Sequence, residues 1–248
     1  MLRRARFLLL LAIPGCAVGL AQGVPGNGVI ATLPRDVGDF QAIEIRGALA
    51  ATVELGPKPS VEIEGDENLI PMVTTVVQGG RLIVAVERGQ SIRPTRPIAL
   101  KITTPAWDTL EIQGASQATA RADGAESLRV KVLGASTAKL SGVGAKELIL
   151  DAQGASKVEA TGHAQVLKLA LGGASNARLD QLEAEDVHVS AEGACSASVK
   201  ANAVVDGKVS GASEVKVSGP ALRRSIQASG ASRVVYSKAA ANPGPAAP

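Results

Sequence analysis

Serine recurs at a near-constant spacing in the second half of the chain, as the third residue of Gly-Ala-Ser triplets. A serine can act as a nucleophile when a histidine or another base lies within hydrogen-bond reach. The two histidines, His163 and His188, fall at different points of successive repeats. We therefore expect the third triplet positions to form a buried structural ladder and not a catalytic site: Ser116, Ser136, Ser156, Ser175, Cys195, Ser213 and Ser232.

Cys195 replaces serine in the triplet Gly193-Ala194-Cys195. A small buried residue is the expectation here, because unpaired cysteine packs as a small apolar side chain, and a reactive thiol is the alternative. The other cysteine, Cys16, lies in the N-terminal leader described below. Once the leader is removed no intramolecular disulfide can form, although export would permit one.

Metal and phosphate chemistry are not indicated by the spacing of the remaining polar residues. Zinc needs clustered ligands, which the two separated histidines do not supply. Glycine pairs such as Gly172-Gly173 lack the lysine-led helix of a phosphate-binding loop. The residues three positions before each triplet form a mixed row with no acidic ladder for calcium: Glu111, Lys131, Asp151, Ala170, Ser190, Lys208 and Gln227. We expect no metal, no cofactor and no enzymatic activity.

The triplets mark a repeat of about 20 residues, with steps of 18 to 20 between their first glycines. Those glycines are Gly114, Gly134, Gly154, Gly173, Gly193, Gly211 and Gly230. Apolar residues alternate with polar ones on both sides of each triplet, as in Leu128, Val130 and Val132. A period of two indicates strands with one buried face. Glycine permits a sharp corner, and the adjacent serines are expected to hydrogen-bond to one another or to corner amides.

Such a unit can bury its apolar face only by stacking on copies of itself. The sequence therefore predicts an all-β fold, a right-handed single-stranded parallel β-helix or solenoid over residues 111–236. At about 4.8 Å per coil, six intervals give a rod of roughly 29 Å. Residues 29–110 alternate less regularly and are expected to form a β-rich N-terminal cap over the first coil's open edge.

Two aromatic residues and the C-terminal tail complete this expectation. Trp107 and Tyr236 stand at opposite ends of the repeat and are expected in the core or in a cap. Tyr236 continues the inward-facing series of the last repeat. Residues 237–248, rich in alanine and proline, have little to bury and are expected to be disordered.

The N-terminus has the parts of a secretory signal over residues 1–21. Three arginines precede the apolar stretch Phe7–Ile13, and Gly19 and Ala21 provide small residues for cleavage before Gln22. The apolar stretch is too short to span a bilayer, and no other segment approaches that length. In an alternative interpretation, Ile13-Pro14-Gly15-Cys16 is a lipobox and Cys16 becomes lipidated. Either way we expect an exported protein, in the periplasm or at the cell surface.

The charge balance argues against nucleic acid as a partner. The formal net charge of +3 comes from the three arginines of the leader, which contains no acid. Without it the chain has 23 basic residues (26 − 3) and 23 acidic ones. Phosphate recognition requires a surplus of cations that this chain does not have.

Several segments, taken in order, resemble a known family. They are Phe40–Gly47, Val61–Ile70, Gly80–Val84 and Ile102–Pro105, followed by the glycine–serine repeats. Together they are similar to the bacterial head GIN domain family, also described as putative auto-transporter adhesins of unknown function, over roughly residues 29–232. The resemblance implies an exported or envelope-attached protein with a right-handed β-helical fold. It transfers no binding residues.

The leading hypothesis is an exported, non-enzymatic envelope or surface protein, an adhesin whose solenoid face binds a macromolecule, either protein or glycan. The alternative is a polysaccharide-binding or carbohydrate-active β-helix protein. An outer-face groove with two carboxylates in hydrogen-bond reach of each other would favour that alternative. A third interpretation is a structural role, in which coils stack between molecules through an uncapped end.

Overall fold

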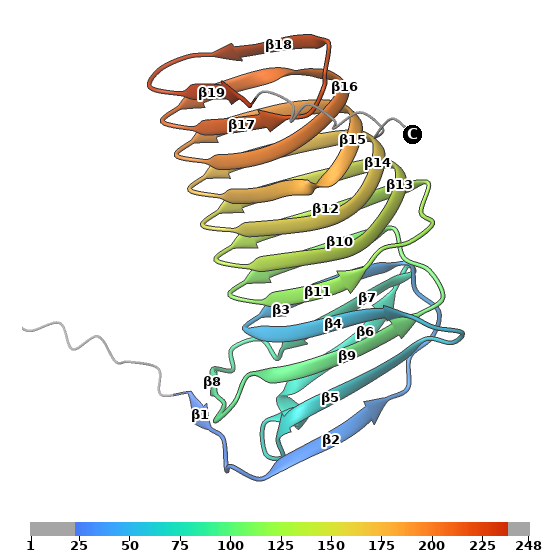
Figure 1. The fold of residues 1–248 in the computed structure, drawn as a ribbon. Helices are drawn as coiled ribbons and strands as arrows, with labels where there is room; N and C mark the ends of the chain where they lie inside the picture. Colours follow the sequence, from blue (N-terminus) through green and yellow to red (C-terminus); the bar gives the residue numbers. More distant parts are fainter. Residues whose placement is uncertain (1–22, 238–248) are drawn as a thin grey trace, which may run out of the picture.

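The Gly-Ala-Ser repeat folds into parallel coils stacked along a rod, in a computed structural model that describes residues 23–237 (Figure 1). The expected leader, with Cys16, and residues 238–248 of the tail lie outside the described residues. β1 (Val24–Pro25) lies near one end of the rod and β19 (Arg233–Tyr236) at the other. The prediction of an all-β parallel solenoid is confirmed.

Each coil consists of a strand that enters the glycine corner and a strand that leaves it. The strands of the repeat are β10 (Thr109–Gly114), β11 (Gln117–Arg121), β12 (Ser127–Gly134), β13 (Thr137–Gly154), β14 (Lys157–Gly173), β15 (Asn176–Gly193), β16 (Ser196–Gly211), β17 (Glu214–Ser218), β18 (Arg223–Ala228) and β19. The longest of them, β13 to β16, continue through the return bend. We call the side built from strands entering the corners the leading face, and the other side the trailing face.

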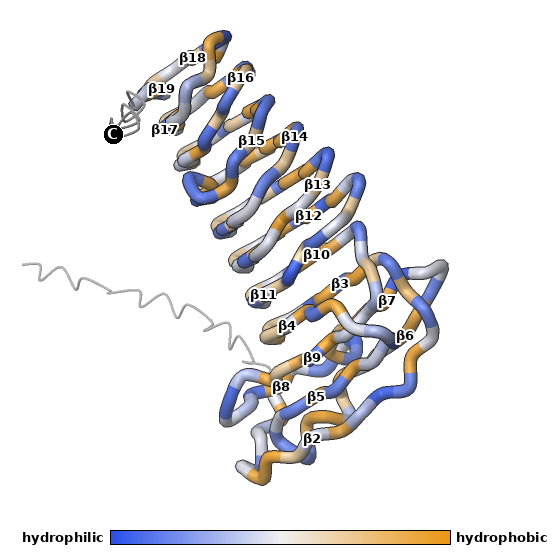
Figure 2. Tube along the Cα trace, turned by 45° about the vertical axis from the view of Figure 1, so that its right-hand side comes forward, coloured by the Kyte–Doolittle hydropathy of each residue, from blue (hydrophilic) through white to orange (hydrophobic). Residues whose placement is uncertain are grey.

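Register is kept by stacking corner on corner. Gly134 pairs with Gly154, and Gly193 pairs with both Gly173 and Gly211. This register places the alternating apolar residues of successive coils in the same interior columns, so that Val130, Leu150 and Leu169 are all buried. Figure 2 shows the alternation of apolar and polar residues along each coil. A one-residue slip would expose every interior side chain of a strand, so burial enforces the register.

Parallel stacking continues into the segment ahead of the repeat. β3 (Ala42–Gly47) pairs with β10, and β4 (Leu49–Leu55) pairs with β11, both in parallel. Below them β7 (Arg81–Val86) and β9 (Ile98–Thr104) pair in parallel with β3 and β4. Trp107, just after β9, is buried, and its indole N–H donates to the Arg121 carbonyl (3.0 Å). The coil architecture therefore extends two layers beyond the first triplet.

The strand direction changes only at the far N-terminal end. β6 (Val73–Gln78) lies antiparallel to β7, β5 (Ser60–Asp66) antiparallel to β9, and β2 (Ile30–Arg35) antiparallel to β5. A single 3₁₀ turn, Ile70–Met72, follows β5, and the short β8 (Ile92–Arg93) pairs with β1.

Asp66 holds three of these N-terminal segments together. Its buried carboxylate accepts hydrogen bonds from the Thr95 amide, the Thr95 hydroxyl and the Gly28 amide, each at 2.8 Å. Burial tends to raise the pKa of this carboxyl, but the hydrogen bonds from Thr95 and Gly28 together outweigh it and hold the pKa below its usual value. The Glu-Gly-Asp segment of the family resemblance thus has a structural role here.

The last coil ends the core in a way that the alternation did not indicate. Tyr236 occupies an inward register position, paired with Val217, yet it stays 37% exposed. Arg224, paired with the buried Val205, takes the equivalent position of β18. Its guanidinium lies 5.1 Å from the centre of the Tyr236 ring. Tyr236 was expected in the core or in a cap: it lies at the end of the core and is not buried within it, because no further coil covers this end within the described chain.

Candidate functional site

The triplet serines from Ser116 to Ser213 are buried at the corners of the coils. The glycines that precede them all have positive φ, a conformation that favours glycine. Ser116, Ser136, Ser156, Ser175 and Ser213 are at most 1% exposed, Cys195 is 3% exposed, and Ser232 of the last coil is half-buried.

Each corner hydroxyl donates within its own coil or to the neighbouring one. The Ser156 hydroxyl donates to the Gln153 carbonyl (2.7 Å) and lies 3.2 Å from the Gly134 carbonyl. The Cys195 thiol makes the equivalent contacts, to the carbonyls of Glu192 (3.3 Å) and Gly173 (3.6 Å). This cysteine therefore substitutes for serine in both place and bonding.

The sequence left open whether the corner serines hydrogen-bond to one another or to corner amides. The structure contains only the bonds with backbone amides. The Cys195 amide donates to the Ser213 hydroxyl (3.2 Å), and the Leu49 amide donates to that of Ser116 (3.3 Å). No triplet serine donates to another triplet serine between residues 23 and 237. The hydroxyl-to-hydroxyl alternative is not found between residues 23 and 237, because nearby carbonyls in the same turn are better placed acceptors.

An eighth corner lies ahead of the triplets and was missed by the sequence reasoning. Gly47 pairs with Gly114 and has φ +114°, and Ala48-Leu49 follow it. Leu49 is buried at the serine position. The Gly-Ala pair between two alternating segments was the available signal, but without serine it did not stand out.

A shallow groove of about 340 Å³ lies on the leading face, across β12 to β16. Its lining includes Arg129, Lys131, Ile149, Lys168, Ala170 and His188. The hollow arises where the outward row passes from Asp151 to Ala170 and then to Ser190, which are register partners in successive coils. Small side chains there leave Ile149 and the Ala170 methyl group accessible as an apolar floor.

The rim of the groove carries three cations, two of which are paired with glutamates just outside the lining: Lys131 with Glu111 (3.9 Å) and Lys168 with Glu147 (2.6 Å). Arg129, Lys131 and Lys168 line it, whereas Asp151 is the only carboxylate among the described lining residues. The Asp151 carboxylate accepts a hydrogen bond from the side-chain amide of Gln153 (2.9 Å). The hydrogen bond from Lys168, opposed by partial burial, holds the pKa of the Glu147 carboxyl below its usual value. The groove can therefore accept an acidic group above an apolar patch.

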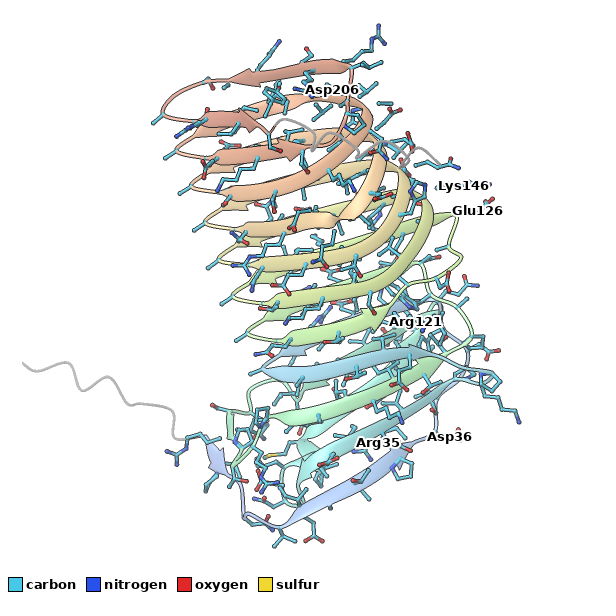
Figure 3. The ribbon with its side chains drawn as sticks, viewed as in Figure 1. Arg35, Asp36, Arg121, Glu126, Lys146 and Asp206 are labelled. Atoms are coloured by element: carbon cyan, nitrogen blue, oxygen red, sulfur yellow. The ribbon has the colours of Figure 1, made fainter. Side chains whose placement is uncertain are left out.

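The two histidines occupy separate surfaces. His188 lines the groove, and its Nδ1 lies 2.7 Å from Asp206 Oδ1 in the next coil. His163 borders a smaller hollow at the return bend, together with Glu126 and Lys146. Figure 3 labels Glu126 and Lys146 at this bend and Asp206 in a higher coil. The Lys146 ammonium donates a hydrogen bond to the Glu126 carboxylate (2.5 Å). No set of three or more His, Cys, Asp or Glu side chains within residues 23–237 is arranged to hold a metal ion.

A pair of stacked glutamates lies next to the groove, toward the N-terminal end. Glu44, whose side chain is 7% exposed, contacts Arg46 (2.5 Å) and Arg81 (3.6 Å). Glu111, one coil on, contacts the same Arg81 (3.5 Å), and the Gln113 amide donates to both carboxylates. Both glutamates are engaged by cations and an amide, so the pair is a structural network and not a free acid–base couple.

The sequence of this chain matches a known protein family. A family model described as "Putative auto-transporter adhesin, head GIN domain" matches residues 39–221. The chain belongs to this head GIN domain family. No curated protein matches the sequence.

Solved structures share the fold of this head GIN domain protein. A putative adhesin from Bacteroides fragilis NCTC 9343 superposes with a TM-score of 0.82 at 18% identity, covering 86% of this chain and 100% of that one. A putative lipid binding protein from Parabacteroides distasonis ATCC 8503 gives 0.66 at 17% identity, covering 88% and 100%. A putative adhesin from Parabacteroides merdae ATCC 43184 gives 0.60 at 18% identity, covering 87% and 99%. At these identities the likeness establishes the fold alone.

Within the part of the chain that the structure describes, no helix has the length and apolar character needed to cross a membrane.

Proposed function

We propose that this head GIN domain protein is an exported, non-enzymatic protein of the cell envelope or surface that binds a macromolecule through the groove on its leading face. The observation that carries the proposal is the combination of an apolar floor at Ile149 and Ala170 with three rim cations. Apolar floors with a few placed charges are typical of binding sites. The partner is a protein or glycan bearing acidic groups, and the family's description as an adhesin supports such a role.

The carbohydrate-active alternative is less well supported by the groove. Glycoside hydrolysis uses two carboxylates that flank the scissile bond. Asp151 is the single carboxylate among the described residues of the lining, and Glu44 and Glu111 are bound to arginine and glutamine. Polysaccharide binding without turnover remains compatible with the proposal, since an acidic glycan suits the cationic rim.

The proposal also covers export, the domain limits and the role of the corner residues. Residues 1–21 act as the leader, and Cys16 is the lipidation site if the lipobox is used. Residues 29–110 form the N-terminal part of the domain, residues 111–236 its repeats and residues 237–248 a tail. The triplet glycines, serines and Cys195 maintain the rod and do not contact the partner.

The test is a glycan array and an envelope pull-down with the mature chain from Gln22, beside two matched double variants. Lys131→Gln with Lys168→Gln removes two rim cations. Lys58→Gln with Arg88→Gln removes two exposed cations of the N-terminal region and serves as the control. We expect the first variant alone to lose at least tenfold in affinity for an acidic ligand. Equal binding by both variants would exclude the groove, and release of smaller sugars from a bound polysaccharide would establish the enzymatic alternative.

A further inference from the structure

The last coil exposes a strand edge that the other coils of the repeat cover. Within residues 23–237, β18 pairs with β16 alone and β19 with β17 alone. One side of each strand therefore keeps backbone N–H and C=O groups that no described residue pairs with. Such an edge is a template for an added strand.

Charge separates this end from the rest of the molecule. The edge strands β18 and β19 contain Arg223, Arg224 and Arg233 and no aspartate or glutamate. Glu214 of β17, one coil below, pairs with Lys216 (3.6 Å) and is the register partner of Arg233. At the opposite end, edge strand β2 carries Pro34, which has no N–H to donate, and mixed charges at Arg35 and Asp36 (Figure 3). Among residues 23–237, only the C-terminal end combines a proline-free edge with charge of one sign, since the other N-terminal edge strand, β6, carries no charged residue.

The side chains of the last coil divide into two groups. Arg224 and Tyr236 cover the end of the core, and Arg224 also donates to the Ala221 carbonyl (2.9 Å). Arg223 and Arg233 are exposed and are in no ion pair found in the described chain, and Leu222, just before β18, is 93% exposed. The backbone edge, two guanidinium groups and one leucine are thus left for a partner.

We propose that the edge formed by β18 and β19 docks an acidic extended segment of another protein by β-strand addition. A strand of about six residues matches the length of β18. A segment paired with β18 would set a carboxylate beside Arg223 and an apolar residue beside Leu222. A segment paired with β19, on the other side of the corner, would set a carboxylate beside Arg233. A second copy of this end is disfavoured by like charge. A lipid surface is disfavoured because an open strand edge cannot enter hydrocarbon unpaired.

The test uses the mature chain from Gln22 and three synthetic eight-residue peptides with blocked ends. One alternates valine with glutamate, the second replaces each glutamate by lysine, and the third keeps the glutamates but replaces two valines by proline. Hydrogen exchange of residues 223–236 is followed with each peptide. We expect slower exchange with the first peptide only, and about tenfold weaker binding after Arg223→Gln with Arg233→Gln.

Several outcomes would overturn the proposal. Equal binding of the proline peptide means attraction by charge without strand pairing. No protection at millimolar acidic peptide means that the edge accepts no strand. The surface would instead bind membranes if the protein sediments with phosphatidylglycerol vesicles, the Arg223/Arg233 variant does not, and the acidic peptide gives no protection from exchange. Self-association lost in the same variant assigns it to a second copy. The Lys131/Lys168 variant should bind the peptide normally, so failure of the groove proposal leaves this one testable.

Discussion

The guanidinium group of Arg224 lies 5.1 Å from the centre of the Tyr236 ring, where the interior columns of valine and leucine come to an end. Both residues occupy positions that hold Val205 and Val217 in the preceding coil. A planar cation over an aromatic face shields apolar surface while keeping its charge hydrated. The pair therefore serves as a terminal lid for the core.

Removing this lid should destabilise the last coil and have little effect on the rest of the solenoid. Arg224→Ala should weaken the last coil by about 1 kcal/mol, since an exposed cation–π contact and its packing are lost. Hydrogen exchange of residues 223–236 should accelerate, with little change in β12 to β15. Arg223→Ala, which removes an exposed neighbour without the ring contact, is the control and should leave exchange unchanged.

Gly134 is needed for two separable reasons. It has φ +79°, and a Cβ there would lie 2.6 Å from the Gly114 carbonyl oxygen of the coil below. Gly142 has φ +61°, but a Cβ there meets nothing within 4 Å. Gly142→Ala should cost about 1–2 kcal/mol from backbone strain, and Gly134→Ala should cost more, because the coils must also separate. Urea unfolding gives both values. Equal losses would show that corner spacing is not limiting.

Ser156 and its neighbour Lys157 provide a matched pair for the inward corner. Leucine at position 156 must fit into a site that is 1% exposed, and it leaves the Gln153 carbonyl without its donor. We expect Ser156→Leu to lower stability by about 2–4 kcal/mol through overpacking and the lost hydrogen bond. Lys157→Leu, on the outward side, should change it by less than about 0.5 kcal/mol. Similar melting temperatures for the two variants would contradict a buried corner.

The lowered pKa of the Asp66 carboxyl predicts that the free energy of unfolding decreases as the pH falls. The pKa of this carboxyl is lowered in the folded chain, so its contribution is complete above the unfolded value of about 3.9 and disappears as the pH falls through the folded pKa. Asp66→Asn should destabilise the protein at pH 7, and the difference from the parent should shrink below about pH 4. Unfolding free energies at pH 7, 5 and 3 test this. A difference that is constant with pH would mean that the charge is not involved. Glu67→Gln, next to it and exposed, is the control.

Much of the solenoid could be predicted from residues close together in the chain. Alternation around Gly134 or Gly173 assigns each side chain to the interior or to solvent, because a strand turns its side chains to opposite faces in strict succession. The burial of Cys195 followed from its place in a triplet. The hydroxyl acceptors did not, because the competing carbonyls lie only three residues away or one coil below, and their relative distances depend on the exact corner geometry.

The groove, the Arg224–Tyr236 lid and the first coil were decided by the tertiary structure. Ala170 is unremarkable in the sequence, and it becomes the floor of a groove only because stacking sets it in one row with Asp151 and Ser190, about 20 residues away on either side. Gly47 becomes a corner because β3 and β4 pair with β10 and β11. Alternation could therefore establish the coil and its inward residues, since these depend on local backbone geometry. The stacking of coils decided which outward residues meet and where the core ends, since these depend on contacts between residues far apart in the chain.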